Sequence, residues 1–275
     1  MKTKCLICNN AKNLKKFKWS NYQIYDCQHC RLHFCPDLIE TEGNSSPVHN
    51  EGIKMMEDSF FKTEKIAFQY AKKRIVKYEK ILQRKCLNIL DIGCGPGVFY
   101  KAYNEMSINW TGVEVSPFWI EFGKKNKIPI LKKNLNEIKE KFDIVTAHQV
   151  LEHVENPIIF INQILRILKP GGILHFEVPN NLSITSSLRK ISPILSYDYG
   201  FIQPPMHMRA YCNQTIKKLF ENNKFSIKDI FTCSNNDSTW GQVRQYSPFQ
   251  KLFFNLSALI GKGSLLIGIA KKPYV

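Results

Sequence analysis

Short apolar runs alternate with segments of helical periodicity throughout the chain after residue 86. A run of about four to eight apolar residues, bounded by glycine, proline or polar residues, is typical of a buried strand. Such runs predict strands at 87–92, 109–115, 128–131, 142–148, 172–178, 225–232 and 264–270. Helices are predicted between several of them, at 98–106, 117–126, 157–168 and 213–222. This alternation predicts an α/β fold with a parallel, doubly wound sheet of seven strands.

The residues before the first predicted strand fall into three stretches. Cysteines concentrate in residues 1–40, and residues 41–58 are rich in Gly, Pro, Ser and Asn, which is typical of a linker. In residues 59–85, apolar side chains recur at roughly helical spacing, at Ile66, Tyr70, Ile75, Tyr78 and Ile81. We therefore expect a small N-terminal module, a linker, and an α/β domain over 59–275 that begins with a basic helix.

The charge balance changes this picture only slightly. The chain carries a formal net charge of +16, which favours nucleic acid, nucleotide-linked substrates or an anionic membrane surface as partners. Its lysines are scattered instead of forming one block, which favours an ordinary solvated surface. No apolar stretch could span a bilayer and the N-terminus lacks the apolar core of a signal peptide, so we expect a cytoplasmic protein without a membrane span.

Two Cys-x2-Cys pairs lie in the N-terminal module. Cys5 and Cys8 form the first pair, and Cys27 and Cys30 form the second. Each pair turns two thiolates toward one ion, and two pairs complete the tetrahedral set of four sulfurs that zinc prefers. Because four thiolates leave no open coordination position, the spacing predicts a zinc-ribbon module with structural zinc. The metal would supply much of the stability of so small a module.

A glycine-rich segment follows the first predicted strand of the α/β domain. Gly93, Gly95 and Gly97 occupy alternate positions, unlike the Gly-x-Gly-x-x-Gly spacing of dinucleotide-binding loops. Alternate glycines let the backbone lie flat against a nucleoside and an amino-acid tail. Asp91 ends the strand before them and can bind an ammonium group. Glu114 ends the next strand, where a carboxylate can accept hydrogen bonds from both ribose hydroxyls.

These segments resemble class I S-adenosylmethionine (SAM)-dependent methyltransferases. Four motifs carry the resemblance: the glycine motif DIGCGPG (91–97), the ribose-binding motif GVEVS (112–116), the fourth-strand segment FDIVTAHQVLEHVENP (142–157) and the turn LKPGG (168–172). The resemblance covers roughly residues 60–275 and implies a Rossmann-like methyltransferase fold with SAM as cofactor. It also implies that adenine lies near Asn134, where the family usually has an acidic residue, and that His148 lies beside the methionine end of SAM.

The cysteine pattern ahead of this domain narrows the resemblance. A Cys-x2-Cys pair, a strand rich in Tyr and Ile, and a Cys-x2-Cys-x-Leu-x-Phe segment look like a bacterial subgroup with an N-terminal zinc-binding module. Genes of that subgroup commonly lie beside genes for surface polysaccharides or modified sugars. The resemblance therefore implies a role in polysaccharide biosynthesis, with a sugar or nucleotide-sugar acceptor.

Methyl transfer needs an acceptor held in line with the methyl group and, for a hydroxyl, a group that removes its proton. His153, after the fourth predicted strand, and His207, in a proline-rich loop, are the candidate general bases, although each could instead orient its own segment. Glu177 and Asn180, at the end of the fifth strand, are candidate ligands for acceptor hydroxyls. The stretch 181–210 interrupts the strand–helix alternation, and insertions of this kind build acceptor pockets.

Three functions are the main possibilities on the sequence, and protein and lipid-quinone acceptors make up the remainder. The leading hypothesis is methyl transfer to a small molecule, with a hydroxyl of a sugar or nucleotide sugar as acceptor. The first alternative is an rRNA or tRNA base methyltransferase, which the net charge and the zinc module also fit. Against it, the chain has neither an Asn/Asp-Pro-Pro-Tyr segment nor a Pro-Cys nucleophile. The second alternative is a non-catalytic SAM-binding protein.

Overall fold

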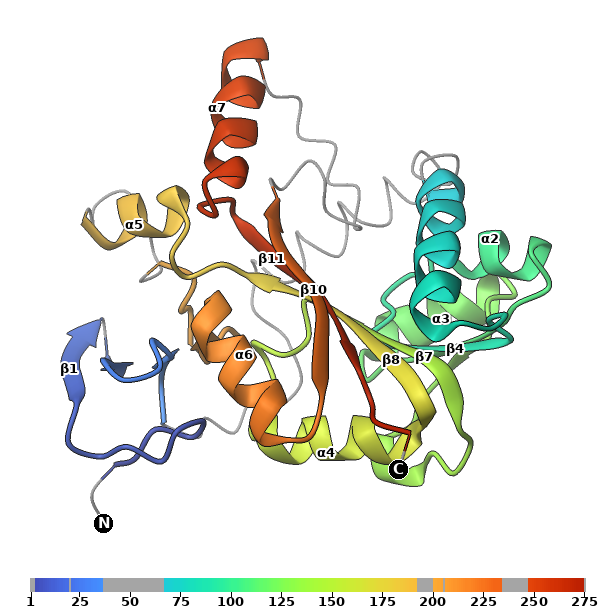
Figure 1. Cartoon of the computed structure of the whole chain (residues 1–275), viewed down its shortest axis with the longest axis horizontal. Coiled ribbons are helices and arrows are strands. Elements are labelled where there is room, and N and C mark those ends of the chain that lie inside the picture. Colours follow the sequence, from blue (N-terminus) through green and yellow to red (C-terminus); the bar gives the residue numbers. More distant parts are fainter. Residues whose placement is uncertain are drawn as a thin grey trace.

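The structure is a computed structural model of the chain (Figure 1). It describes residues 3–19, 21–36, 67–191, 200–204, 206–233 and 247–274. The predicted linker at 41–58 and the beginning of the predicted basic helix lie outside these ranges. The described part of that helix covers 67–82.

Seven strands form one sheet in the order β10-β11-β8-β7-β4-β5-β6. Their bounds are β4 (Asn88–Ile92), β5 (Asn109–Val113), β6 (Ile130–Leu131), β7 (Phe142–His148), β8 (Leu168–Pro179), β10 (Ser226–Cys233) and β11 (Leu265–Lys271). Strands β4 to β8 pair in parallel, whereas β11 lies antiparallel between β8 and β10. The predicted seven-stranded α/β sheet is confirmed, except that the sheet is mixed and not wholly parallel. The strand order reverses beside β4, so a ligand crevice is expected at the carboxyl ends of β4 and β7.

Helices cover both faces of the sheet, as Figure 1 shows. One face packs against helix 67–82, α2 (Tyr100–Glu105) and α3 (Pro117–Lys125), and the other packs against α4 (Pro157–Ile167) and α6 (Asn213–Asn222). Neighbouring strand residues divide between the two cores: Ile89 and Ile144 face the first set of helices, and Leu90 and Val145 face the second. The division follows from the strand geometry, because successive side chains point to opposite faces.

Local chemistry explains where the helices begin. The side chain of Asn156 accepts hydrogen bonds from the amides of Ile158 and Ile159 at 3.0 and 3.1 Å, and Pro157 occupies the first helical position of α4. Both features are typical of a helix start. A proline also opens α3, at Pro117.

The N-terminal module is joined to the α/β domain through a second sheet. Its strands β1 (Leu14–Trp19), β2 (Tyr22–Cys27) and β3 (His33–Phe34) continue into β9 (Arg209–Ala210), which belongs to the α/β domain. All pairs in this sheet are antiparallel. The module lies beside α6 (Figure 1), where Phe34 shares one apolar core with Ile216 and Leu219.

Two helices that the sequence pattern did not predict lie near the carboxyl ends of the strands. They are α5 (Ile184–Ile191), within the predicted insertion, and α7 (Pro248–Leu259), which precedes β11. None of the helices in the described ranges combines the length and the apolar character needed to cross a membrane.

Candidate active site

The loop after β4 has a backbone conformation that favours glycine. Gly93, Gly95 and Gly97 have φ angles of 61°, 52° and 70°, in the left-handed region where side chains are strained. The amide of Gly93 donates to the carbonyl of Val113 at 2.9 Å, which ties the loop to β5. A Cβ atom on Gly97 would lie 2.8 Å from Cγ2 of Ile128, so space is tight as well. The loop can therefore present bare backbone to a ligand.

Two carboxylates flank this loop. Glu114, directly after β5, accepts hydrogen bonds from the amides of Gly95 and Ser116, both at 3.0 Å. Asp91, at the end of β4, is buried and accepts a hydrogen bond of 2.6 Å from the hydroxyl of Thr146. Burial raises the pKa of Asp91 to about 6. A cationic ligand group beside this carboxylate would favour its ionised form.

A row of buried polar side chains lies between the sheet and helix 67–82. The hydroxyl of Tyr78 is 2.6 Å from Nδ1 of His175, and that nitrogen is 3.2 Å from Nε2 of His148. Burial, together with the positive charge of Arg74, holds the pKa of His148 well below its usual range. His148 is therefore a neutral ring that is hydrogen-bonded inside the protein at the end of β7.

Arg74 of the same helix is a candidate ligand-binding residue that the sequence analysis missed. Its guanidinium carbon lies 4.7 Å from the ring centre of Phe99, which follows the glycine loop, and its charge acts on Asp91. Its Nη1 atom is buried and no described residue meets the geometry of a hydrogen bond to it, although the buried hydroxyl of Tyr103 lies close enough to interact with the guanidinium. An unpaired donor of this kind is costly unless a ligand completes it, so it suits a carboxylate. The sequence marked the helix as basic but could not single out one side chain within it.

Asn134, the predicted adenine contact, follows β6, which is the edge strand of the seven-stranded sheet and pairs with β5. Its amide donates to the carboxylate of Glu137 at 2.7 Å, and the two residues form a capping box on the short 3-10 helix η1 (Leu135–Glu137). The side chain of Asn134 is exposed. Helix capping explains the residue type, and a contact with adenine stays a prediction.

The fold brings the two predicted bases together, although they lie far apart in the sequence. The ring centres of His153 and His207 are 4.7 Å apart. Each ring has its Nδ1 atom beside a backbone carbonyl, Met206 at 2.9 Å for His153 and Phe201 at 3.2 Å for His207. Because a carbonyl only accepts, Nδ1 carries the proton in the neutral ring and Nε2 is the basic nitrogen. Burial and the neighbouring His153 lower the pKa of His207 to about 3.

Glu152 stands beside this pair and was also missed. Its side chain is 0% exposed, and neither carboxylate oxygen has a hydrogen-bond partner among the described residues. Burial, with a smaller contribution from the charge of Glu177, raises the pKa of Glu152 to about 8. One ligand atom each from Glu152, His153 and His207 lies within 4.8 Å of the others. Such a cluster can exchange a proton near neutral pH, and its atoms are also of the kinds that hold divalent ions.

The two candidate acceptor ligands at the end of β8 differ in the structure. Glu177 is 1% exposed and accepts a hydrogen bond of 3.2 Å from the side chain of Gln149. The side chain of Asn180 donates to the carbonyl of Gly263 at 2.8 Å and accepts from the amide of Leu182 at 3.1 Å. Asn180 therefore holds the turn before β11 against the end of β8.

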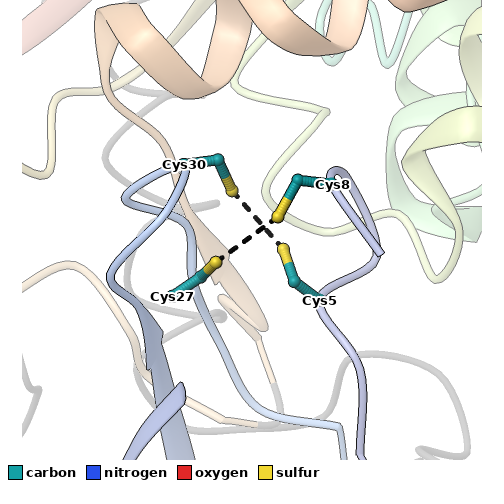
Figure 2. A group of neighbouring side chains, drawn as sticks. All are labelled: Cys5, Cys8, Cys27 and Cys30. Carbon is teal, nitrogen blue, oxygen red and sulfur yellow. Dashed lines mark hydrogen bonds between the residues drawn. The ribbon is translucent and has the colours of Figure 1, made fainter. Parts of the chain in front are cut away.

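The four cysteines of the N-terminal module converge on one point, as Figure 2 shows. The Sγ atoms of Cys5 and Cys30 are 3.4 Å apart, those of Cys8 and Cys27 are 3.5 Å apart, and all four lie within 4.8 Å of one another. Zn–S bonds of about 2.3 Å would place tetrahedral sulfurs about 3.8 Å apart. A hydrogen bond from the Cys30 thiol lowers the pKa of Cys5 to about 5, which favours a thiolate. The donor set therefore fits a zinc ion.

The chain is similar to known methyltransferases over most of its length. A family model described as a methyltransferase domain matches residues 63–229. The ubiquinone biosynthesis O-methyltransferase of Pelagibacter ubique is 26% identical over 230 residues, which cover 75% of this chain and 90% of that protein. The mitochondrial enzyme of the same name from Schizosaccharomyces pombe is 34% identical, but the match covers only 35% of this chain and 40% of that protein. Both names describe O-methylation in ubiquinone biosynthesis and give no support to a sugar or polysaccharide acceptor.

Solved structures agree on the fold. A plantazolicin methyltransferase, BpumL, in complex with SAH has a TM-score of 0.56 and 19% sequence identity, and the match covers 83% of this chain and 91% of that one. Its complex with a pentazolic desmethyl analogue and SAH gives a TM-score of 0.57. At this identity the likeness concerns the fold, and it agrees with the Rossmann-like sheet expected from the sequence.

Proposed function

This chain belongs to the methyltransferase-domain family and is a SAM-dependent methyltransferase, and we propose that it methylates a hydroxyl group of a small-molecule acceptor. The observation that carries the proposal is the arrangement at the carboxyl edge of the sheet. The glycine loop and Glu114 lie after β4 and β5, Glu152 and His153 follow β7, and His207, just before β9, joins these two in one cluster. The residues proposed to bind the cofactor and those proposed to accept a proton thus lie near the ends of neighbouring strands, where α/β folds bind ligands.

SAM supplies, when bound, a methyl group on an electrophilic sulfonium. Cofactor contacts are assigned to the residues expected from the sequence: Asp91, Gly93, Gly95, Gly97, Glu114, Asn134 and His148. To these we add Arg74, whose buried and unpaired Nη1 suits the carboxylate of the amino-acid tail. Asp91 suits the ammonium group of the same tail, because a cation would stabilise its ionised form.

The acceptor is assigned to the space beside Glu152, His153 and His207. Methyl transfer to a hydroxyl oxygen would require a group of the protein to take up the hydroxyl proton. The Nε2 atom of His153 is the nearby group assigned to accept it. His207, whose pKa is about 3, is a weaker acceptor beside it, and Glu152, whose pKa is about 8, keeps its own proton at neutral pH. A positioned general base of this kind contributes ~10²–10⁴-fold to a rate.

Two hydroxyl classes are candidates for the acceptor. The sugar or nucleotide-sugar hydroxyl expected from the sequence is supported by the net charge of +16, which would attract a diphosphate. A phenolic hydroxyl is supported by the relatives, whose names place them in ubiquinone biosynthesis. Both classes need the same proton transfer, so the cluster serves either.

Residues 1–40 are assigned to a zinc-binding module and residues 59–275 to the methyltransferase domain. The geometry of the four cysteines supports zinc in a structural role. In a structural site of four thiolates the ion has no open position, so the zinc takes no part in methyl transfer.

A transfer assay with methyl-labelled SAM tests the proposal against three pools. These are nucleotide sugars with glycan extract, phenolic quinone precursors, and total RNA. Label in either of the first two pools supports a small-molecule hydroxyl and identifies its class. Label in RNA alone would overturn the proposal. The variant His153→Gln should lose transfer while it still binds SAH, and the exposed-site variant Lys15→Gln is its control.

A further inference from the structure

Residues 206–211 of the α/β domain, which include His207 of the proposed acceptor site, contain a strand whose sheet partner lies in the N-terminal module. Strand β9 consists of only Arg209 and Ala210, which pair with Phe34 and His33 of β3. The pairing is extended by the amide of Cys35, which donates to the carbonyl of Met208 at 2.9 Å. A strand this short gains its stability from its neighbours, because a two-residue strand alone is too short to persist.

The opposite side of the same segment holds the proposed proton-accepting cluster. The amide of Met208 donates to the carbonyl of Glu152 at 3.1 Å. The guanidinium of Arg209 donates to the carbonyls of Val154 and Glu155. Residues 207–211 therefore lie between the module on one side and the segment 151–155 on the other. Their position determines where His207 stands relative to Glu152.

The second cysteine knuckle itself is bonded to the α/β domain. The hydroxyl of Thr215, which is 0% exposed, donates to the carbonyl of Cys30 at 2.6 Å. The side chain of Gln214 donates to the carbonyl of His29 at 3.1 Å. Both donors lie in the first turn of α6, four and five residues after the end of β9. Geometry at the metal site is thus transmitted to the start of α6 through two hydrogen bonds.

The module also lies near α5, which belongs to the stretch 181–210 that is expected to build the acceptor pocket. Asp26 of β2 is close enough to Lys190 of α5 for their charges to interact. Lys190 in turn donates to the side chain of Asn181 at 2.8 Å. By contrast, the hydrogen bonds that the glycine loop and Glu114 make to described residues all lie within the α/β domain.

We propose that the N-terminal module is a latch for the acceptor site: its four-thiolate centre holds β3 against β9 and thereby places His207 beside Glu152. The proposal rests on the proposed function, because it takes residues 206–210 as a wall of the acceptor site. A small metallo-module unfolds when its ion is removed. Removal of the ion would then release β9 and leave the SAM half of the site in place. Acceptor binding would therefore depend on whether the four cysteines hold their ion, whereas cofactor binding would not.

Hydrogen exchange and SAH titration test this inference without any acceptor. The full chain is compared with zinc bound, after chelation, and after zinc is restored. Zinc removal should speed amide exchange in residues 206–211 by about tenfold or more, because local opening then needs no unpairing from β3. Exchange in β4 and β7 should stay unchanged, and the Kd for SAH should change by less than about twofold. The variant Cys8→Ser should reproduce the chelated state, whereas Cys86→Ser, a buried cysteine outside the module, should not.

Two further results would overturn the latch. One is exchange in residues 206–211 that does not respond to zinc, and the other is a loss of SAH binding in parallel with zinc. If Cys8→Ser does not fold, Thr215→Val provides the test, since it removes the hydroxyl bond to Cys30 together with the weaker contact of 3.3 Å between that hydroxyl and the thiol of Cys212. That variant should speed exchange in 206–211, and Thr215→Ser should restore the original rate.

The latch and the proposed function can fail separately. If an acceptor is found, zinc removal should raise its KM or lower kcat while the Kd for SAH stays constant. If no hydroxyl acceptor exists, the hydrogen-exchange experiment still tests the latch, because it does not use an acceptor. A zinc-dependent exchange rate without methyl transfer to hydroxyls would retain the latch and overturn the function.

Discussion

Replacement of Glu152 by glutamine should make the stability of this protein less dependent on pH. Glu152 is 0% exposed with both oxygens unpaired among the described residues, and burial raises its pKa from 4.5 to about 8. The folded chain therefore prefers the neutral carboxyl, whereas the unfolded chain ionises it near the ordinary pKa. The contribution of Glu152 to stability is therefore greatest below pH 4.5, falls as pH rises, and levels off above about pH 8.

The size of the effect follows from the two pKa values. One pKa unit corresponds to about 1.36 kcal/mol. Between pH 4.5 and pH 7, a span of about 2.5 pH units, ionisation of Glu152 lowers the free energy of the unfolded chain relative to the folded chain by about 3 kcal/mol. Glutamine cannot ionise, so this loss is absent from Glu152→Gln. The amide adds a cost of its own for an unpaired polar group, but that cost does not vary with pH.

Chemical denaturation at several pH values between 4.5 and 8 measures the difference. The free energy of unfolding of Glu152→Gln, relative to the original chain, should rise by about 3 kcal/mol from pH 4.5 to pH 7. The control is Glu121→Gln on α3, whose side chain is 75% exposed. It should leave the pH dependence of the original chain in place. A constant difference between Glu152→Gln and the original chain at all pH values would refute the burial argument.

Three further predictions concern the cofactor site and the module. Gly112→Ala would place a Cβ atom 2.3 Å from the indole of Trp110, so overpacking should lower the free energy of unfolding by about 1–3 kcal/mol in chemical denaturation. An unchanged midpoint would contradict the tight packing behind the glycine loop. Glu114→Gln should weaken SAH binding in calorimetry by about 10- to 100-fold, since charged hydrogen bonds contribute about 1.5–3 kcal/mol, and equal affinity would exclude Glu114 from the ribose site. Cys5→Ser should lower the zinc content from one ion per chain toward zero, as measured by metal analysis, and retention of the ion would exclude this sulfur as a ligand.

Local physical chemistry made much of the fold predictable from the sequence. Strand β7 occupies 142–148 as predicted, because an apolar run between polar boundaries has few alternatives to a buried strand. The positive φ angles of the glycine loop could be anticipated at Gly93, Gly95 and Gly97, since only glycine adopts them without strain. The convergence of the four cysteines likewise followed from their spacing, because each pair forms its own turn.

The tertiary structure alone decided the chemistry around His207. Its approach to His153 and Glu152 depends on how residues separated by more than fifty positions meet, and no local period encodes that distance. Burial gives Glu152 its raised pKa, and burial is a property of everything packed around the side chain. Strand β9 is two residues long, too short for an alternating pattern, and exists because β3 pairs with it. The sequence by itself thus determined the strands, the cofactor loop and the cysteine knuckles, whose geometry arises within a few residues. The proposed acceptor wall and its proposed coupling to the N-terminal module rest on contacts that only the folded chain makes.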